Sequence, residues 1–470
     1  MGKHYGRTWT TLASLLTIQL GGLVWGMAAG PAQASPAAGL GGSYDLVNIS
    51  DQIGAAGFGR GSGRGHLQVD SSTGRIHFEY GETVMSLGGG CPVAASQQSA
   101  CARRFDRSQT NRSVHNAGTY QLSADGTLSV ALDAPDSTGL TTLGGFVNTD
   151  RGILVLASRS DQGTHVMVAV HHDFDGHRPD AFGKGPVLFG QYAYNARSVE
   201  FPRSITSVQG KWDSYGTDVR YGDLSAAGFR YILNQSDTAM QEALTCVSAA
   251  GGCAASASIL SSLAAGVSAG ETLSGRNGQV FLIPDGHQDA SLAWQGAVSG
   301  DGTFAAVESA NATGQQGVAL LVRKGSGLSN TTAVGTFNAV AMEEFFDSDS
   351  GVRSAFVNGK IVFDNQSQWT FNGTDSSTKR FECAGNQQCP SPGLFSRTVA
   401  GGAGGSYTVG TRGDISMVGV AGDNTPRVFA GTVSPDGSIV VLRRVVDSGA
   451  CSFDCTGTES ARSLILAMRP

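Results

Sequence analysis

Apolar and polar residues alternate in short segments along the chain, and one arrangement occurs three times. In each copy a bulky residue, a glycine and a valine fall on the same face: Leu143, Gly145 and Val147; Trp294, Gly296 and Val298; Phe429, Gly431 and Val433. Alternation with a period of two predicts half-buried β-strands. A glycine in each core-facing row predicts that a neighbouring backbone approaches closely there.

Turn signals separate these segments. Asn-Gly or Asp-Gly dipeptides stand between strand-forming residues at Asp125-Gly126, Asn277-Gly278, Asp301-Gly302 and Asp436-Gly437. Such dipeptides favour β-hairpins because both central residues of the tight turn adopt positive φ. Helical patterns are confined to residues 236–246 and 255–265. The chain is therefore predicted to be all-β.

The strand pattern belongs to an internal repeat. A Gly-x-aromatic motif begins at Gly42, Gly190 and Gly335, so the unit is roughly 145 residues long. Two further glycine anchors recur within each unit at matching distances: Gly118, Gly270 and Gly405, then Gly145, Gly296 and Gly431. We predict repeat units at 39–184, 185–329 and 330–470, each with eight or nine strands in a meander and each folding by itself.

A meander of this length can close on itself as an up-and-down barrel. A unit that starts with Gly-x-aromatic resembles the lipocalin and avidin-like (calycin) barrels. Tyr44, Tyr192 or Phe337 stands where those families have a tryptophan, so the resemblance implies a fold and no ligand. The alternative is one six-bladed propeller with two blades per unit. The apolar runs 153–157 and 439–442 favour it, because they predict strands covered on both faces.

The N-terminal residues predict export. Lys3 and Arg7 precede an apolar stretch, and Ala32-Gln33-Ala34 forms a small-x-small cleavage site, so residues 1–34 have the pattern of a signal peptide. Residues 35–470 hold no second apolar run long enough to span a membrane. The formal net charge of −6 and the lack of a basic cluster argue against nucleic acid as a partner. We expect a secreted, periplasmic or cell-surface protein of a Gram-negative bacterium.

The eight cysteines follow the repeat. One pair precedes the middle glycine of each unit, and a fourth pair lies in an insertion in the third unit: Cys91 and Cys101, Cys246 and Cys253, Cys383 and Cys389, Cys451 and Cys455. Paired cysteines in an exported chain favour disulfides over metal ligation. We therefore predict four local disulfides.

Few residues suggest a chemical site. The segment His171 to His177 is dense in imidazoles and carboxylates, and Asp173, Asp175 and His177 are the candidate ligands for Ca²⁺ or another divalent ion. A solvated polar joint between units is the alternative, since the other two units lack this segment. No other cofactor is predicted.

Two patterns that occur in catalytic sites are also present in the chain. Residues 266–270 match G-x-S-x-G, which marks a nucleophile only at a strand-turn-helix elbow. Four glutamates could supply the carboxylate pair of a glycosidase: Glu79, Glu82, Glu343 and Glu344. No catalytic residue is assigned from either pattern.

Three functions remain open. The first is a non-enzymatic binding or structural protein whose partner is a cell-surface polymer or another exported protein. The second is a secreted hydrolase or lyase that acts on an extracellular polymer. The third is a carrier that holds a small ligand inside a barrel, which requires an open cavity.

Overall fold

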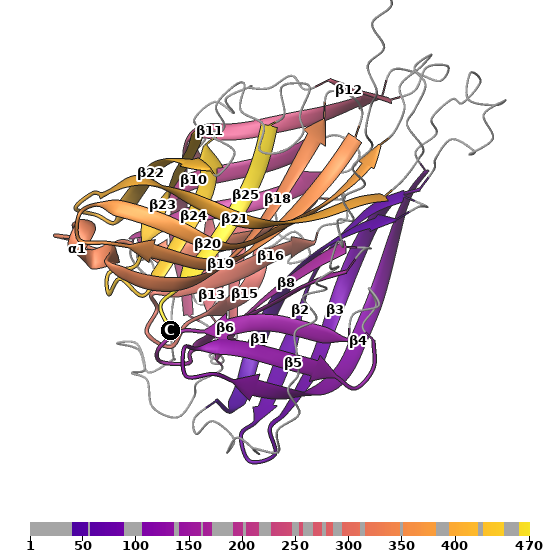
Figure 1. The fold of residues 1–470 in the computed structure, drawn as a ribbon, viewed down its shortest axis with the longest axis horizontal. Helices are drawn as coiled ribbons and strands as arrows, with labels where there is room; N and C mark the ends of the chain where they lie inside the picture. Colours follow the sequence, from indigo (N-terminus) through magenta and orange to yellow (C-terminus); the bar gives the residue numbers. More distant parts are fainter. Residues whose placement is uncertain are drawn as a thin grey trace, which may run out of the picture. The chain divides into compact units, whose positions relative to one another are not determined.

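The computed structural model shows a chain built almost entirely of antiparallel β-strands (Figure 1). The described residues belong to one compact unit within Pro36–Pro470. They are residues 40–54, 57–88, 106–135, 141–160, 163–171, 191–200, 204–215, 227–246, 253–256, 267–274, 279–284, 294–310, 315–347, 351–381, 394–421, 426–445 and 460–470.

The first sheet is a closed barrel of eight strands in chain order, because β8 pairs back onto β1. Its strands are β1 (Gly42–Gly54), β2 (Gly57–Asp70), β3 (Arg75–Gly88), β4 (Asp106–Leu122), β5 (Thr127–Leu132), β6 (Thr142–Val147), β7 (Ile153–Ser160) and β8 (Gly163–His171).

The second sheet has nine strands. They are β9 (Gln191–Glu200), β10 (Ser204–Tyr215), β11 (Ala227–Cys246), β12 (Cys253–Ser256), β13 (Val267–Ser274), β14 (Gln279–Pro284), β15 (Trp294–Val298), β16 (Phe304–Ala310) and β17 (Gln315–Arg323). Strand β17 pairs with β9 and β10 pairs with β11, so eight of the strands form a ring and β12 adds to the side of β11.

The third sheet is again a closed barrel of eight strands in chain order. Its strands are β18 (Gly335–Asp347), β19 (Gly351–Phe363), β20 (Gln368–Phe381), β21 (Leu394–Val409), β22 (Asp414–Ala421), β23 (Pro426–Val433), β24 (Ile439–Val445) and β25 (Ser460–Met468). The barrel prediction is therefore confirmed and the propeller is excluded. The three sheets lie within 39–184, 185–329 and 330–470, and independent folding of each unit stays a prediction.

The helix prediction was wrong for residues 236–246, which form the last part of β11. Residues 253–256 form β12, and the rest of the second predicted helix lies outside the described residues. Within the described ranges the one helix is α1 (Asn330–Ala333), and no described helix is long and apolar enough to cross a membrane. Pairing of this stretch with β10, and of its last four residues with β12, outweighed a local helical preference that is weak in any case.

Three of the four predicted turns and the predicted close approaches are confirmed, and the fourth turn, Asn277-Gly278, lies outside the described residues. Gly126, Gly302 and Gly437 have φ of 74°, 68° and 71° in tight hairpins. A Cβ on Gly145 would overlap the carbonyl oxygen of Val155, and the same holds for Gly431 against Val441. Glycine at these core-facing positions lets the strand behind it approach.

Each closed barrel is filled by its own apolar core. In the first barrel Tyr44, Phe78 and Leu128 are buried with other inward side chains, and in the third Phe337, Phe363 and Tyr407 pack edge to face. The hydroxyl of Tyr120 donates to the carbonyl of Leu40, and that of Tyr407 to the carbonyls of Asn330 and Asp364. These two tyrosines therefore have satisfied polar ends.

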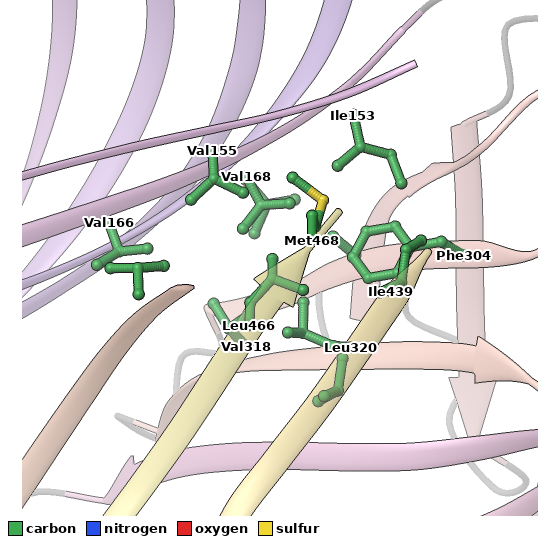
Figure 2. Close-up of a cluster of buried hydrophobic side chains, with 14 of the residues drawn as sticks. Ile153, Val155, Val166, Val168, Phe304, Val318, Leu320, Ile439, Leu466 and Met468 are labelled. Atoms are coloured by element: carbon green, nitrogen blue, oxygen red, sulfur yellow. The ribbon is translucent and has the colours of Figure 1, made fainter. Parts of the chain in front are cut away.

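A further apolar cluster lies on the outer faces of the strands (Figure 2). Val155, Val166 and Val168 of the first sheet contribute to it with Phe304 of the second and Leu466 of the third. Strands such as β8 are therefore buried on both faces, inward by the barrel core and outward by this cluster. The apolar runs that favoured a propeller arise from this second layer of packing.

Candidate functional site

Most of the predicted site residues lie outside the described part of the chain, including Asp173, Asp175 and His177. His171 is described: its Nε2 lies 3.2 Å from the carbonyl oxygen of Gly41, and its ring meets Tyr44 edge-on. These contacts give His171 a packing role at the end of β8. The divalent-ion site at 173–177 stays a prediction.

The cysteines are described at one pair. Cys246 and Cys253 lie directly opposite each other in the antiparallel pairing of β11 and β12. Opposed residues in such a ladder have Cα atoms about 4.5–5.5 Å apart, which is within the range that a disulfide spans. Cys91, Cys101, Cys383, Cys389, Cys451 and Cys455 lie outside the described residues, so the four disulfides stay predictions.

The two catalytic patterns have different outcomes. Ser268 lies inside strand β13 opposite Leu233, so the G-x-S-x-G segment does not form a strand-turn-helix elbow. Glu79 faces outward and Glu82 inward on the first barrel, because they are three positions apart on β3 and successive side chains alternate between faces. Glu343 and Glu344 lie in β18, and their side chains are outside the described set.

A polar cluster occupies the interior of the first barrel. It consists of Asn48 and Ser50 on β1, Glu82 on β3, Arg112 on β4 and His165 on β8. On each strand these residues face inward, like the buried apolar residues of the same strand nearer the other end of the barrel. The interior is therefore apolar at one end and polar at the other.

Glu82 is the centre of the polar cluster. Its Oε1 accepts hydrogen bonds from Ser50 Oγ at 2.5 Å and Asn48 Nδ2 at 3.3 Å, and its Oε2 accepts from Arg112 Nε at 2.6 Å. Asn48 Nδ2 also lies 3.1 Å from His165 Nε2. Glu82 is 3% and His165 1% exposed, and a Cβ on Gly61 would overlap Glu82.

This geometry describes a structural network. A general acid or base must reach a proton on its substrate, whereas both oxygens of Glu82 are already engaged inside the barrel. Buried charge of this kind is tolerated because it is paired and hydrogen-bonded. The cluster does not supply the second, accessible carboxylate that glycoside hydrolysis needs.

The interior of the third barrel is also filled. Apolar side chains that include Trp369, Met417, Phe429 and Ile465 line a cavity of about 50 Å³. An engineered cavity of about 150 Å³ is the size that admits benzene. The cavity is therefore too small for an ordinary organic ligand.

The outer face of the first barrel carries a different arrangement. One row across β1 to β4 pairs Asp45 with His66, His66 with Glu79, and Glu79 with His115. His77 lies two residues before Glu79 and is exposed on the same face. We call the outward side chains of Asp45, His66, His77, Glu79 and His115 the histidine face.

The histidine face lies along an open hollow of about 690 Å³. The hollow is lined by Ser43, His66, Leu67, Gln68, His77, Phe78, Glu79, His115, Asn116 and Ala117. The side chains of His66, Glu79 and His115 are 58%, 74% and 68% exposed. His66 Nδ1 lies 3.0 Å from Asp45 Oδ1, and His115 Nδ1 lies 3.9 Å from Glu79 Oε1. This surface is accessible and offers both donors and acceptors.

A second buried carboxyl lies where the second sheet meets the first. Glu308 of β16 is 4% exposed and lies 3.5 Å from Arg64 Nη1. Burial raises its pKa to about 7, and the neighbouring Arg64 offsets this only in part.

The fold is that of an all-β protein with two closed eight-stranded barrels and a further sheet. No family model and no curated protein matches the chain. Among solved structures, it is similar to the isotype 1 transferrin-binding protein B from serogroup B Neisseria meningitidis. That similarity has a TM-score of 0.23 at 9% sequence identity and covers 91% of this chain and 76% of that chain.

Proposed function

We propose that this chain is an exported, non-enzymatic binding protein that engages another exported protein through the histidine face of its first barrel. The observation that carries this proposal is that the described side chains inside the two closed barrels pack into apolar cores, which favours binding at an outer surface. A small-ligand carrier needs an interior cavity of several hundred cubic ångströms. The filled interiors therefore count against the carrier hypothesis.

The polar network in the first barrel supports binding over catalysis. Its carboxylate is held by an arginine, a serine and an asparagine and is shielded from solvent. The exposed carboxylate of the histidine face, Glu79, has imidazoles on both sides. A glycoside hydrolase needs two carboxyl groups of its own on either side of the bond that it cleaves, whereas imidazoles flank Glu79.

The chemistry of the hollow favours a polar protein surface as the partner. Exposed imidazoles, a carboxylate and the amides of Gln68 and Asn116 can form hydrogen bonds with backbone and side chains. The aromatic ring among the lining residues, Phe78, points into the barrel core. A sugar polymer would be expected to stack on an outward aromatic ring, so we favour a protein.

The proposal is tested by filling the hollow. Labelled mature chain is titrated against the envelope and secreted fractions of the producing bacterium, and release of polymer fragments is measured in parallel. We expect saturable, protease-sensitive binding without fragment release. Gln68→Trp, which places a large ring in the hollow, should weaken this binding at least about tenfold, as loss of an interface centre does.

Ser129→Trp is the matched control, because Ser129 is exposed on β5 of the same barrel and lies outside the hollow. It should bind like the unmodified chain. Equal binding by Gln68→Trp and the unmodified chain would place the binding surface elsewhere. Binding that resists protease treatment would identify a polymer, and release of fragments would identify an enzyme.

A further inference from the structure

The register of the strands places several metal-ligating side chains next to one another on the histidine face. Glu79 lies on β3 with His66 opposite it on β2 and His115 opposite it on β4. His77 is two residues away on the same strand and on the same face. Directly opposed residues have Cβ atoms about 4.5–5.5 Å apart, and two residues along a strand span about 6.8 Å. Three imidazoles therefore surround one carboxylate.

From this juxtaposition we propose that the histidine face binds one divalent transition-metal ion, such as Zn²⁺, through His66, His77, His115 and Glu79. Imidazole nitrogen and carboxylate oxygen are ordinary zinc ligands, at about 2.0–2.2 Å. Ca²⁺ and Mg²⁺ take oxygen ligands instead, so three imidazoles select against them. The proposal deepens the proposed function, because it assigns a ligand to the same surface.

The contact between Asp45 and His66 supports this assignment. Asp45 Oδ1 lies 3.0 Å from Nδ1 of His66, and the Asp45 side chain is 8% exposed. A carboxylate that engages one ring nitrogen fixes the ring and directs the other nitrogen outward. His66 is thereby oriented like a metal ligand with its supporting carboxylate.

The ligand set forms by rotation of exposed side chains. Among the described residues, no three His, Cys, Asp or Glu side chains already converge on one point. Exposed side chains change rotamer within nanoseconds, whereas the strands that carry them are fixed by pairing on both sides. Ion binding therefore needs no movement of the backbone.

The test uses the mature full-length chain, freed of metal with a chelator, and Zn²⁺ as the probe. Isothermal titration should show one saturable ion per chain. The double variant His66→Ala/His115→Ala should weaken zinc affinity at least about a hundredfold, and Asp45→Asn about 10- to 100-fold, the usual range for loss of a supporting group.

Two control variants separate the possible outcomes. Gln68→Ala changes the same hollow without removing a ligand and should bind zinc like the unmodified chain. The triple variant Asp173→Asn/Asp175→Asn/His177→Ala tests the other candidate segment and should also bind normally. Far-ultraviolet circular dichroism of every variant should be unchanged, because His66 and His115 are exposed and Asp45→Asn keeps the size of the buried Asp45 side chain.

The proposal is overturned if the unmodified chain gives no saturable zinc binding, or if the double variant binds zinc as strongly as the unmodified chain. Either result leaves the proposed function intact as long as Gln68→Trp still weakens envelope binding. Zinc binding that depends on the histidine face, with envelope binding unaffected by Gln68→Trp, would reject the proposed function and keep the metal site.

Discussion

The first and third barrels share strand order and register but differ inside. Tyr44 in the first corresponds to Phe337 in the third, and each lies in the apolar end of its barrel interior. Farther along, Asn48 corresponds to Ala341 and His165 to Ser463. Arg112 corresponds to Val399, counted from the paired tyrosines Tyr120 and Tyr407.

The difference shows that the barrel does not require an amide, a guanidinium and an imidazole at these three positions. Closure depends on features that both barrels have, such as the core-facing glycines and the tight hairpins. Buried ionic groups can often be replaced by apolar side chains without loss of stability. Asn48, Arg112 and His165 are thus particular to the first barrel, which also carries the histidine face, whereas in the third barrel the acidic residues Glu343 and Asp375 stand at the positions of Ser50 and Glu82.

The largest effect is expected from removing one partner of the buried ion pair. Arg112→Val introduces the residue of the third barrel and leaves Glu82 without its arginine. We expect the free energy of unfolding to fall by about 3 kcal/mol, at the lower end of the range for broken buried pairs because Arg112 is 26% exposed. Urea denaturation of the mature chain measures it.

The control for this change removes both charges. Arg112→Val/Glu82→Leu should recover most of the lost stability, because no unpaired carboxylate remains inside the barrel. An Arg112→Val chain as stable as the unmodified one would show that the ion pair between Arg112 and Glu82 does not contribute to the free energy of unfolding.

Replacing the second buried carboxyl group, that of Glu308, should stabilise the chain at neutral pH, whereas removing the arginine beside Glu82 should destabilise it. Burial holds the pKa of Glu308 at about 7, above its ordinary 4.5, so the folded state keeps a proton that the unfolded state loses. Stability should therefore fall as pH rises from 4.5 to 7, by up to about 3 kcal/mol. Glu308→Gln should remove this fall and be more stable at pH 8.

Thermal unfolding of both proteins between pH 4 and 8 measures this contrast. The two curves should converge at the acidic end, where Glu308 is protonated in both states of the unmodified chain. Parallel curves would mean that Glu308 is not desolvated. In that case the buried carboxyl groups of Glu82 and Glu308 would not have opposite effects on stability.

A smaller effect is expected when an asparagine equivalent to Asn48 is introduced into the third barrel. Ala341→Asn gives the third barrel the residue found at position 48 of the first, where it would face apolar neighbours and the small cavity. An unsatisfied buried amide should cost about 1–3 kcal/mol. Ala341→Leu, of similar size and without polar atoms, should cost less, and equal losses would assign the effect to volume.

The smallest effect concerns the turn between β4 and β5. Lys360 Nζ lies 2.9 Å from Asp125 Oδ2, and this pair with Thr127 lowers the pKa of Asp125 to about 2. The stability from this group is complete above pH 4 and is lost as pH falls through 2. Lys360→Met should reduce that acid loss by less than about 1 kcal/mol, because both side chains are half exposed.

Acid titration of unfolding between pH 5 and 2 measures the pair. Identical profiles for Lys360→Met and the unmodified chain would show that Thr127 alone holds the pKa of Asp125 down.

Much of the fold could be predicted because it is encoded locally. Alternation around Gly145 and Gly431 and the Asp-Gly turns predicted strands and hairpins at the positions where they occur. Burial of β8 on both faces could not be assigned, because its outer face packs against residues from other sheets. The stretch 236–246 was misjudged for a similar reason, since pairing with β10 decides its structure.

The site was harder to predict, because its residues meet across strands. His66 and Glu79 are opposed by the hairpin that follows Asp70, and His115 joins them only once the pairing of β3 with β4 is known. The alternating glycines Gly63 and Gly65 indicate a close approach of β3, because a Cβ on either would overlap a β3 carbonyl oxygen, but they do not indicate the outward histidines. The dense segment at 171–180 drew attention instead, because its residues are adjacent in sequence.

The most direct test of the central claim is a histidine-labelling footprint. Diethyl pyrocarbonate modifies accessible imidazoles, and mass spectrometry reports each site with and without the bound envelope partner. We predict that His66, His77 and His115 are modified in the free chain and protected in the complex, while His165 stays unmodified in both. Unchanged labelling of the histidine face in a saturated complex would contradict the account, as would labelling of His165 on binding.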